Sequence, residues 1–156
     1  MSSIAGVRGI WRYSGELTLL IIGLLLLGGC SLFQSVPSGP KSYTTQNDLI
    51  EYTRVVPQQV RVGSVFTVEV TVKAKVELAL LAIAEQLPTG FLPAVANEPL
   101  TALGNSLKPG DEIKLSYQVQ ASSETGTFQL VGRARALPPG KDSVMLPLGT
   151  PVKVTR

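Results

Sequence analysis

The sequence predicts an all-β domain, a single antiparallel β-sandwich of about seven strands, from three observations. First, several stretches alternate apolar and polar side chains with a period of two, the pattern of a strand with one buried face and one wet face. Second, short turn motifs rich in Gly, Pro and Asp separate these stretches. Third, the chain lacks internal repeats. The sandwich is preceded by a segment of a different kind.

That amino-terminal segment has the order of a secretory signal, which is basic, then apolar, then small. Arg8 and Arg12 precede an apolar run, Leu17–Leu27, whose eleven positions are interrupted only by Thr18 and Gly23. A helix that spans a bilayer comfortably needs roughly 20 apolar residues, so this run is shorter than a typical transmembrane segment. The segment therefore predicts export from the cytoplasm.

The segment ends in Leu27-Gly28-Gly29-Cys30, which contains the only cysteine of the chain. These residues resemble a bacterial lipobox, in which an aliphatic residue and two small ones precede the cysteine that is lipidated. The resemblance implies cleavage between Gly29 and Cys30, a diacylglycerol thioether on Cys30, and acylation of the new amino terminus, for example with palmitate. Two or three acyl chains hold a protein durably on a membrane. The alternative is an uncleaved signal anchor with an incidental buried cysteine.

The residues after the cysteine are rich in Ser, Thr, Gln, Gly and Pro, which predicts a solvated, flexible tether. The predicted organisation is a signal peptide at 1–29, the lipidated cysteine and tether at 30–48, and the sandwich at 49–156. In a cell with two membranes, Ser31 lacks the aspartate associated with inner-membrane retention of enteric lipoproteins, which favours the outer membrane. We therefore expect a membrane-anchored lipoprotein of the cell envelope that faces away from the cytoplasm, into the periplasm where there is one.

The predicted strands follow the tether in order. They comprise residues 52–56, 66–73, 77–87, 113–120, 128–135 and 152–155, separated by turns at 62–64, 108–111, 124–127 and 138–142. Pro57 ends the first strand. In the fifth, Leu130 and Ala134 share the apolar face, whereas Arg133 and Arg135 point to the opposite face.

Residues 77–87 are ambiguous, because their residue types favour a helix. The stretch is short, however, lacks a helix cap, and runs directly into Pro88-Thr89-Gly90. We interpret it as a central strand buried on both faces, with a short helix as the alternative.

The order of strands and turns carries a second resemblance. Gly63–Val72, Glu85–Phe91, Leu107–Val119 and Thr125–Leu130 together resemble a bacterial immunoglobulin-like repeat, closest to the cell-surface conserved-repeat and CARDB adhesion-related domains. The resemblance covers most of residues 50–156. It implies an immunoglobulin-like sandwich that acts as a spacer, an adhesive module or an assembly part, and the fold alone does not choose among these.

Composition argues against several classes of function. The chain has no histidine, which removes the commonest general base and the commonest metal ligand. Without Arg8, Arg12 and Glu16, 12 of the 14 basic and 10 of the 11 acidic residues remain, and this balance is not that of a nucleic-acid-binding protein. We expect no catalytic residue, no metal ligand set, no small-molecule substrate, and no cofactor other than the covalent lipid on Cys30.

Three further features could indicate a specific chemistry, and each has a simpler interpretation. Leu87-Pro88-Thr89-Gly90 resembles part of a sortase signal but lacks its last residue and its apolar tail, so a turn is the better interpretation. Asp111-Glu112 provides too few carboxylates for a calcium-binding loop. A serine hydrolase would need an uncommon Ser–Lys arrangement.

Residues 91–107 form a long connection that carries several apolar residues, including Phe91 and Leu92. One interpretation is an exposed apolar surface or edge strand that docks a partner. The interpretation we favour is one or two short strands that cross between the sheets, with these side chains in the core. Arg133 and Arg135 are candidates for binding a partner carboxylate or an anionic glycan. The candidate partner surface therefore comprises Phe91, Leu92, Arg133 and Arg135.

The sequence thus predicts a lipid-anchored envelope protein that acts without catalysis, as a structural or protein-interaction module beside an envelope protein partner. The alternative is an adhesion-type module that binds carbohydrate or cell wall. That alternative needs exposed aromatic side chains, and Phe66, Tyr117 and Phe128 are expected in the core.

Overall fold

The computed structural model describes residues 39–156, which form ten strands and no helix. The strands are β1 (Pro40–Gln46), β2 (Ile50–Pro57), β3 (Gln59–Arg61), β4 (Val65–Ala74), β5 (Leu78–Gln86), β6 (Leu92–Pro93), β7 (Thr101–Leu107), β8 (Glu112–Gln120), β9 (Gly126–Leu137) and β10 (Val144–Thr155). The predicted signal peptide, Gly29, Cys30 and the first part of the tether lie outside the described residues. In residues 39–156 no helix is long and apolar enough to cross a membrane.

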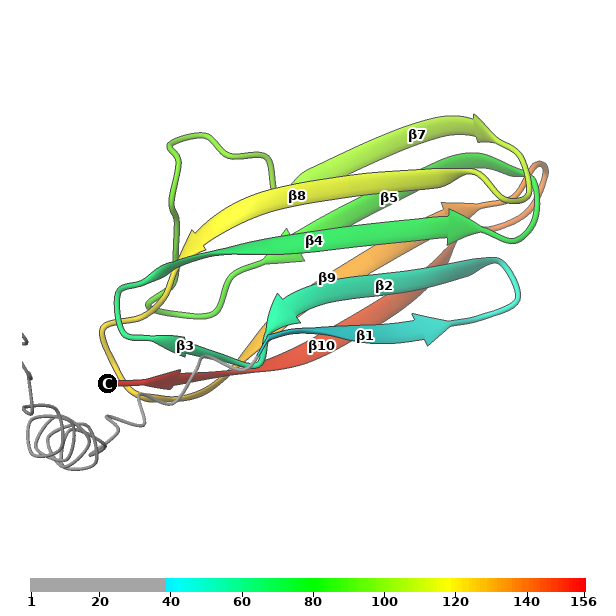
Figure 1. The fold of residues 1–156 in the computed structure, drawn as a ribbon. Coiled ribbons are helices and arrows are strands. Elements are labelled where there is room, and N and C mark those ends of the chain that lie inside the picture. Colours follow the sequence, from blue (N-terminus) through cyan, green and yellow to red (C-terminus); the bar gives the residue numbers. More distant parts are fainter. Residues whose placement is uncertain (1–38) are drawn as a thin grey trace, which may run out of the picture. The chain divides into compact units, whose positions relative to one another are not determined.

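Two five-stranded sheets pack against each other as an immunoglobulin-like sandwich, which confirms the predicted fold class (Figure 1). Sheet A has the order β1-β2-β4-β8-β6, and sheet B has the order β3-β10-β9-β5-β7. All neighbouring strands are antiparallel except β3 and β10, which are parallel. The predicted number of about seven strands was too low, since β3 and β6 are three and two residues long and too short to show an alternation.

Strand β1 corrects the predicted tether, which was expected to extend to residue 48. Pro40–Gln46 pairs with β2 along its whole length, from Pro40 opposite Pro57 to Gln46 opposite Glu51. Most of its side chains are exposed, so its composition is as polar as that of a linker. This segment forms a strand because it pairs with β2, and its composition does not reveal that pairing. The sandwich therefore begins at Pro40.

Strand β5 confirms that residues 77–87 contain a strand. It lies between β9 and β7, with Leu81 and Ile83 buried on its inner face. The prediction of burial on both faces was too strong, because Ala82 and Ala84 on the outer face are only half-buried. Neighbours on both sides satisfy the backbone of β5, and this tertiary context overrides its helical residue types.

Strand β10 is much longer than the short closing strand predicted from Val152 and Val154. It spans Val144–Thr155 and pairs with β9 from Val144 to Val154. Pro147 and Pro151 hid it in the sequence, because proline normally argues against a strand. Both prolines are tolerated because β3 pairs only with residues 153–155 of β10, which leaves the far side of the strand open at the prolines.

The connection 91–107 crosses between the sheets, as favoured from the sequence, with β6 in sheet A and β7 in sheet B. The expectation that its apolar side chains lie in the core holds for Phe91 and is wrong for Leu92, Val95 and Leu103, which are 61, 52 and 63% exposed. Phe91 anchors this crossover inside the sandwich. Its ring packs edge-on against Phe66 and Phe128, with centroids 6.3 and 5.0 Å away. Phe91 is only 4% exposed, so its prediction as a partner-surface residue was wrong. A phenyl ring between two sheets gains more from burial than a surface position offers.

Candidate functional site

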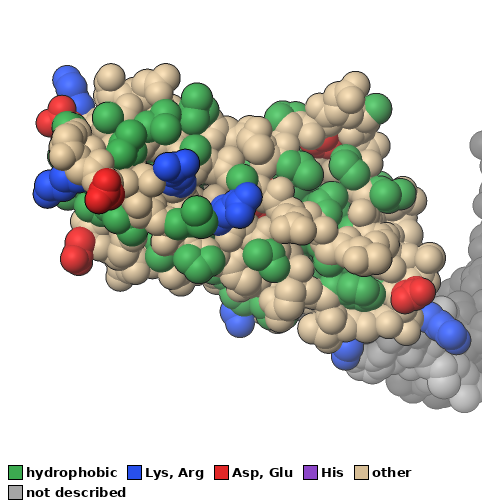
Figure 2. Space-filling model, turned by 180° about the vertical axis from the view of Figure 1, so that it is seen from behind, with side chains coloured by type: hydrophobic (Ala, Val, Ile, Leu, Met, Phe, Trp, Pro, Cys, Tyr) green, Lys and Arg blue, Asp and Glu red, His purple; other side chains and the backbone are tan. Residues whose placement is uncertain are grey.

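The outer face of sheet B, called the sheet B face below, is the most distinctive surface of the domain. Strand pairing defines it as three rows of outward side chains that cross the sheet. The rows are Leu103, Ala82, Arg135 and Met145; Thr101, Ala84, Arg133 and Pro147; and Gln86, Val131 and Gly149. None of these residues is acidic. Figure 2, which views the domain from the side opposite to Figure 1, shows hydrophobic side chains spread over the surface with Lys or Arg side chains among them.

Large apolar side chains on this face are well exposed. Leu103, Met145 and Val131 expose 63, 55 and 47% of their surface. The outer face of sheet A has the ordinary polar pattern instead, as in Thr67 and Glu69 of β4 and Lys114 of β8. Monomeric proteins rarely expose contiguous apolar patches larger than a few hundred Å², and larger patches often mark a binding site. The two faces of one sandwich thus differ in chemistry.

Arg133 and Arg135 lie on the middle strand of the sheet B face, and both are exposed, as the sequence predicted. The Nε of Arg135 donates a hydrogen bond to Ser143 Oγ at 2.9 Å. Within residues 39–156, neither guanidinium group forms a salt bridge. The face therefore combines apolar contact area with positive charge that no carboxylate of the described residues neutralises.

Leu92 does not join the two arginines. It is 61% exposed, but it lies on β6 at the edge of sheet A, whereas Arg133 and Arg135 lie on sheet B. The four predicted surface residues are therefore divided, with Phe91 in the core, Leu92 on the edge of sheet A, and only the arginine pair on the sheet B face. Leu103 belongs to the apolar segment 91–107, whose side chains were expected in the core, and its 63% exposure contradicts that expectation. Met145 was missed because the last strand was predicted only over 152–155, which left Met145 outside every predicted strand.

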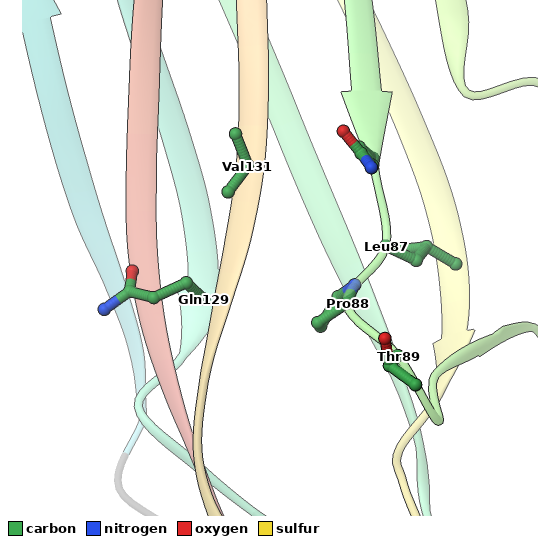
Figure 3. A pocket seen from close by; sticks show the side chains of 6 residues that line it. Leu87, Pro88, Thr89, Gln129 and Val131 are labelled. Atoms are coloured by element: carbon green, nitrogen blue, oxygen red, sulfur yellow. The ribbon is translucent and has the colours of Figure 1, made fainter.

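A small pocket of about 210 Å³ adjoins this face, where β5 runs into the turn at Pro88 (Figure 3). It is lined by Gln86, Leu87, Pro88, Thr89, Gln129 and Val131. Small-molecule sites usually measure roughly 300–1,000 Å³ and contain convergent polar groups. This pocket is smaller and its lining has no charged side chain, so we assign no ligand to it.

Metal binding finds no support in the described residues. No group of three or more acidic or cysteine side chains comes together anywhere in residues 39–156. Asp111 of the Asp111-Glu112 pair accepts a hydrogen bond from the Lys108 amide at 2.7 Å. That bond closes the turn before β8, and the predicted turn is confirmed.

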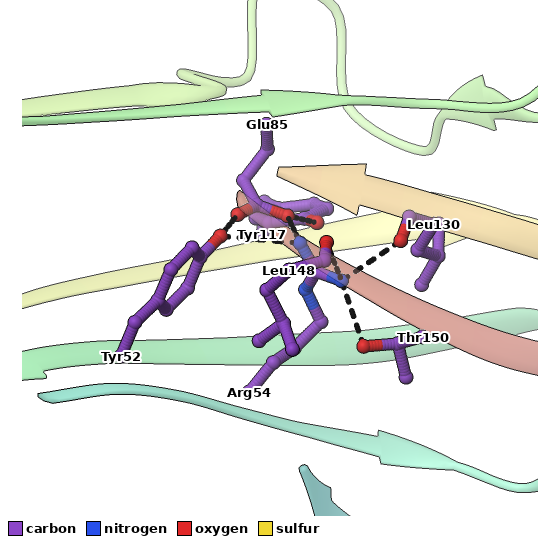
Figure 4. Close-up of polar contacts among 7 residues, drawn as sticks. All are labelled: Tyr52, Arg54, Glu85, Tyr117, Leu130, Leu148 and Thr150. Carbon is purple, nitrogen blue, oxygen red and sulfur yellow. Dashed lines mark hydrogen bonds and ion pairs between the residues drawn. The ribbon is translucent and has the colours of Figure 1, made fainter. Parts of the chain in front are cut away.

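A buried ion pair links the two sheets beneath the sheet B face (Figure 4). Arg54 lies on the inner face of β2, and Glu85 lies on the inner face of β5. Arg54 Nη2 is 2.6 Å from Glu85 Oε2, and both side chains are fully buried. Arg54 Nη1 also donates to the Leu130 carbonyl at 2.9 Å and to Thr150 Oγ1 at 2.8 Å. One guanidinium group thus connects β2 with three strands of sheet B.

Two tyrosines complete this network. Tyr117 donates its hydroxyl to Glu85 Oε2 at 2.8 Å, and Tyr52 donates to Glu85 Oε1. Burial, the largest cause, raises the pKa of both hydroxyls above the ordinary value, and the nearby Glu85 carboxylate adds to the effect. Both therefore stay protonated and act as hydrogen-bond donors. Of the polar atoms in this network, only Arg54 Nε lacks a partner among the described residues.

Gly132 of β9 makes room for the network. A Cβ atom at this position would overlap Glu85 Oε1, Tyr52 Oη and Arg54 Nη2. Gly132 lies between Val131 and Arg133, so the network supports the very strand that carries the two arginines. A catalytic role would require contact with a substrate, and the side chains of Arg54 and Glu85 are enclosed. The network is a structural link between the sheets.

The buried pairing of Arg54 with Glu85 is not predicted from the sequence. The signal was present, since both residues occupy inward positions of alternating strands, Arg54 between Tyr52 and Val56, and Glu85 after Ile83. Two opposite charges on inward positions of two strands are the mark of a buried ion pair.

The comparisons with known proteins extend the fold assignment. No family model and no curated protein matches the chain. The chain is similar to the crystal structure of the yeast GGA1 GAE domain, with a TM-score of 0.50, 13% identity, and coverage of 72% of this chain and 98% of that chain. It is also similar to the ASH/PapD-like domain 7 of human CEP192, with a TM-score of 0.42, 9% identity, and coverage of 80% and 92%.

These likenesses concern the fold. At 13% identity, the GAE domain supports an immunoglobulin-like sandwich and nothing finer. The resemblance to the CARDB and conserved-repeat domains stays a prediction.

Proposed function

We propose that this chain is a lipid-anchored protein of the bacterial cell envelope, whose sandwich binds a partner protein through the sheet B face and catalyses no reaction. The observation that carries the proposal is the composition of that face, which is apolar around two arginines that form no salt bridge within residues 39–156. Interface cores are enriched in aromatic residues, Arg and Met and depleted in Lys, Glu, Asp, Ser and Ala. The three rows of the sheet B face share the Arg and Met of that composition and its lack of Lys, Glu and Asp, and they present Leu103 and Val131 in place of aromatic rings. The outer face of sheet A carries Lys and Glu side chains instead.

The chemistry of the face also indicates the kind of partner. Arg133 and Arg135 present two planar guanidinium groups that can bind carboxylates in a bidentate manner. Apolar side chains lie on both sides of them, among them Leu103 and Met145. The matching surface is a protein surface with exposed aliphatic side chains around one or two Asp or Glu residues.

Carbohydrate binding is the weaker candidate. Sugar sites rely on exposed aromatic rings, and among the described aromatic residues Tyr52, Phe66, Phe91 and Tyr117 are buried. Only Tyr43 and Phe128 are partly exposed, and Phe128 packs on Phe91. Co-sedimentation of the purified protein with peptidoglycan would favour this candidate over the protein partner.

The proposed anchor depends on Cys30. We expect Cys30→Ser to move the protein from the membrane fraction to the soluble fraction, because the thioether cannot form and several acyl chains are lost together. Metabolic labelling with a radioactive or alkyne-bearing palmitate measures the same change directly. Label on the Cys30→Ser protein, or unchanged membrane association, would contradict a lipid anchor.

The partner surface is tested by reversing its charge. We expect Arg133→Glu with Arg135→Glu to lower the amount of co-purified partner at least about 10-fold, because carboxylates would then face carboxylates. The matched control is Lys73→Glu with Lys114→Glu on the outer face of sheet A. All four side chains are exposed, so the thermal midpoint of the double arginine variant should stay near that of the wild type. The control loses the exposed Lys114–Glu112 salt bridge and places a glutamate opposite Glu112, so its midpoint should fall slightly. Equal losses in the two double variants would overturn the assignment of the face.

A further inference from the structure

The edges of the two sheets differ in how well they are protected. An edge strand exposes unpaired amides and carbonyls, and proteins protect such strands by shortness, charge or proline. In sheet B, β3 is only three residues long and contains Arg61. In sheet A, β6 contains Pro93, and the loop after it covers β8, where Glu98 Oε1 accepts the Gln118 amide at 2.9 Å.

The other edge of sheet A is protected as well. Strand β1 begins with Pro40 and Lys41, and at its far end Lys75 Nζ hydrogen-bonds Gln46 and the Asn47 carbonyl. Strand β7 has no such device. Its seven residues, Thr-Ala-Leu-Gly-Asn-Ser-Leu, include neither a charged side chain nor a proline.

The alternation of hydrogen bonds between β5 and β7 shows which backbone amides and carbonyls of β7 point away from the sheet. The Glu85 amide donates to the Leu100 carbonyl at 2.8 Å, which fixes the ladder between β5 and β7. Because an antiparallel ladder alternates, Ala102 and Gly104 point their backbone groups toward β5. Thr101, Leu103 and Asn105 therefore point theirs away from the sheet, where no other strand of the described residues pairs with β7. Leu103 also has the most exposed large apolar side chain of residues 39–156.

We propose that β7 pairs with β7 of a second copy of this chain, antiparallel about a two-fold axis, so that the two B sheets become one continuous sheet. In the register that uses all available groups, Leu103 lies opposite Leu103 of the second copy, and Thr101 lies opposite Asn105 of the second copy. Every residue that points outward then exchanges both of its backbone hydrogen bonds. The interface is isologous, as a two-fold dimer requires.

A second copy can pair with this edge because β7 has no charged side chain that would repel β7 of the other copy. The strand is uncharged, and Arg135 lies two strands in from the edge. At a strand spacing of about 4.8 Å, the Arg135 side chains of the two copies are about 24 Å apart, beyond the screening length of physiological salt. Stacking two sheet B faces would instead place arginine against arginine. Two copies can therefore associate through β7 without bringing like charges together, whereas they cannot do so through the sheet B face.

The test uses the full-length protein in native membranes with Leu103→Cys and a short bis-maleimide cross-linker. We expect a covalent dimer, identified by mass as two copies of the peptide that contains position 103. The control is Val65→Cys, which is 55% exposed and lies on an inner strand of sheet A. Cys30 is unchanged in both variants. A dimer yield no higher than in the Val65→Cys control, or cross-linking of position 103 to a different protein, would overturn the proposal.

A second measurement needs no cysteine. By light scattering of the purified full-length protein in detergent, we expect a dimer for the wild type and for Val65→Lys. Leu103→Lys should raise the dimer dissociation constant at least about 10-fold, because like charges would lie directly opposite each other across the two-fold axis. A monomeric wild type at all concentrations would contradict the proposal. The light-scattering measurement omits the envelope partner, and the cross-linking measurement counts only adducts between two copies of this chain, so a failure of either would leave the function proposed for the sheet B face standing.

Discussion

We expect Glu85→Leu to lower the free energy of unfolding by about 3–5 kcal/mol, because the Arg54 guanidinium would stay buried without its carboxylate. The two tyrosine hydroxyls that donate to Glu85 would lose their acceptor at the same time. Urea denaturation followed by circular dichroism measures the change. The loss should appear in the denaturation midpoint, since no large change in the surface exposed on unfolding accompanies it.

Two further variants test whether the loss of stability in Glu85→Leu comes from the buried ion pair. Arg54→Met with Glu85→Leu removes both charges, and should recover much of the stability lost in Glu85→Leu alone. Glu112→Gln breaks the other salt bridge of the described residues, with Lys114 at 3.4 Å, and should cost less than about 1 kcal/mol because that pair is exposed. Similar losses for Glu85→Leu and Glu112→Gln would contradict the role of the buried pair.

The second large effect concerns Gly132. We expect Gly132→Ala to lower the free energy of unfolding by about 1–3 kcal/mol, because the added methyl group would overlap atoms of Tyr52, Arg54 and Glu85. A matched variant is Gly149→Ala on the neighbouring strand β10, where the nearest atom, Gln129 Oε1, would be 3.6 Å from the new Cβ. Gly149→Ala should leave stability nearly unchanged. Equal thermal midpoints for the two variants would show that the network does not depend on the missing side chain.

Sequence periodicity predicted the inner strands well. Strands β4, β8 and β9 each have one buried and one exposed face, which appears in the sequence as an alternation of inward and outward residues. The edge strand β1 was taken for a tether because both of its faces are largely exposed. The predicted extent of β10 was too short, because two prolines lie in the part of the strand that has a neighbouring strand on only one side. What the sequence could not supply in each case was the identity of the neighbouring strand.

The candidate site was predicted less completely. The outward direction of Arg133 and Arg135 follows from local alternation and is confirmed. The surface role of Phe91 was wrong, because its burial depends on Phe66 and Phe128, which are remote in sequence. The pairing of Arg54 with Glu85 joins residues 31 positions apart and requires the packing of two sheets. Local pattern gives the direction of a side chain and not its partner.

The most direct test of the partner surface places one photoreactive residue at Met145, on the sheet B face, and another at Thr71, on the outer face of sheet A. Intact cells are irradiated, and the covalent products are identified by mass spectrometry. We predict one dominant adduct with a single other protein from position 145 and no corresponding adduct from position 71. Glycan adducts, the same products from both positions, or no product from position 145 would contradict a protein partner bound through the sheet B face.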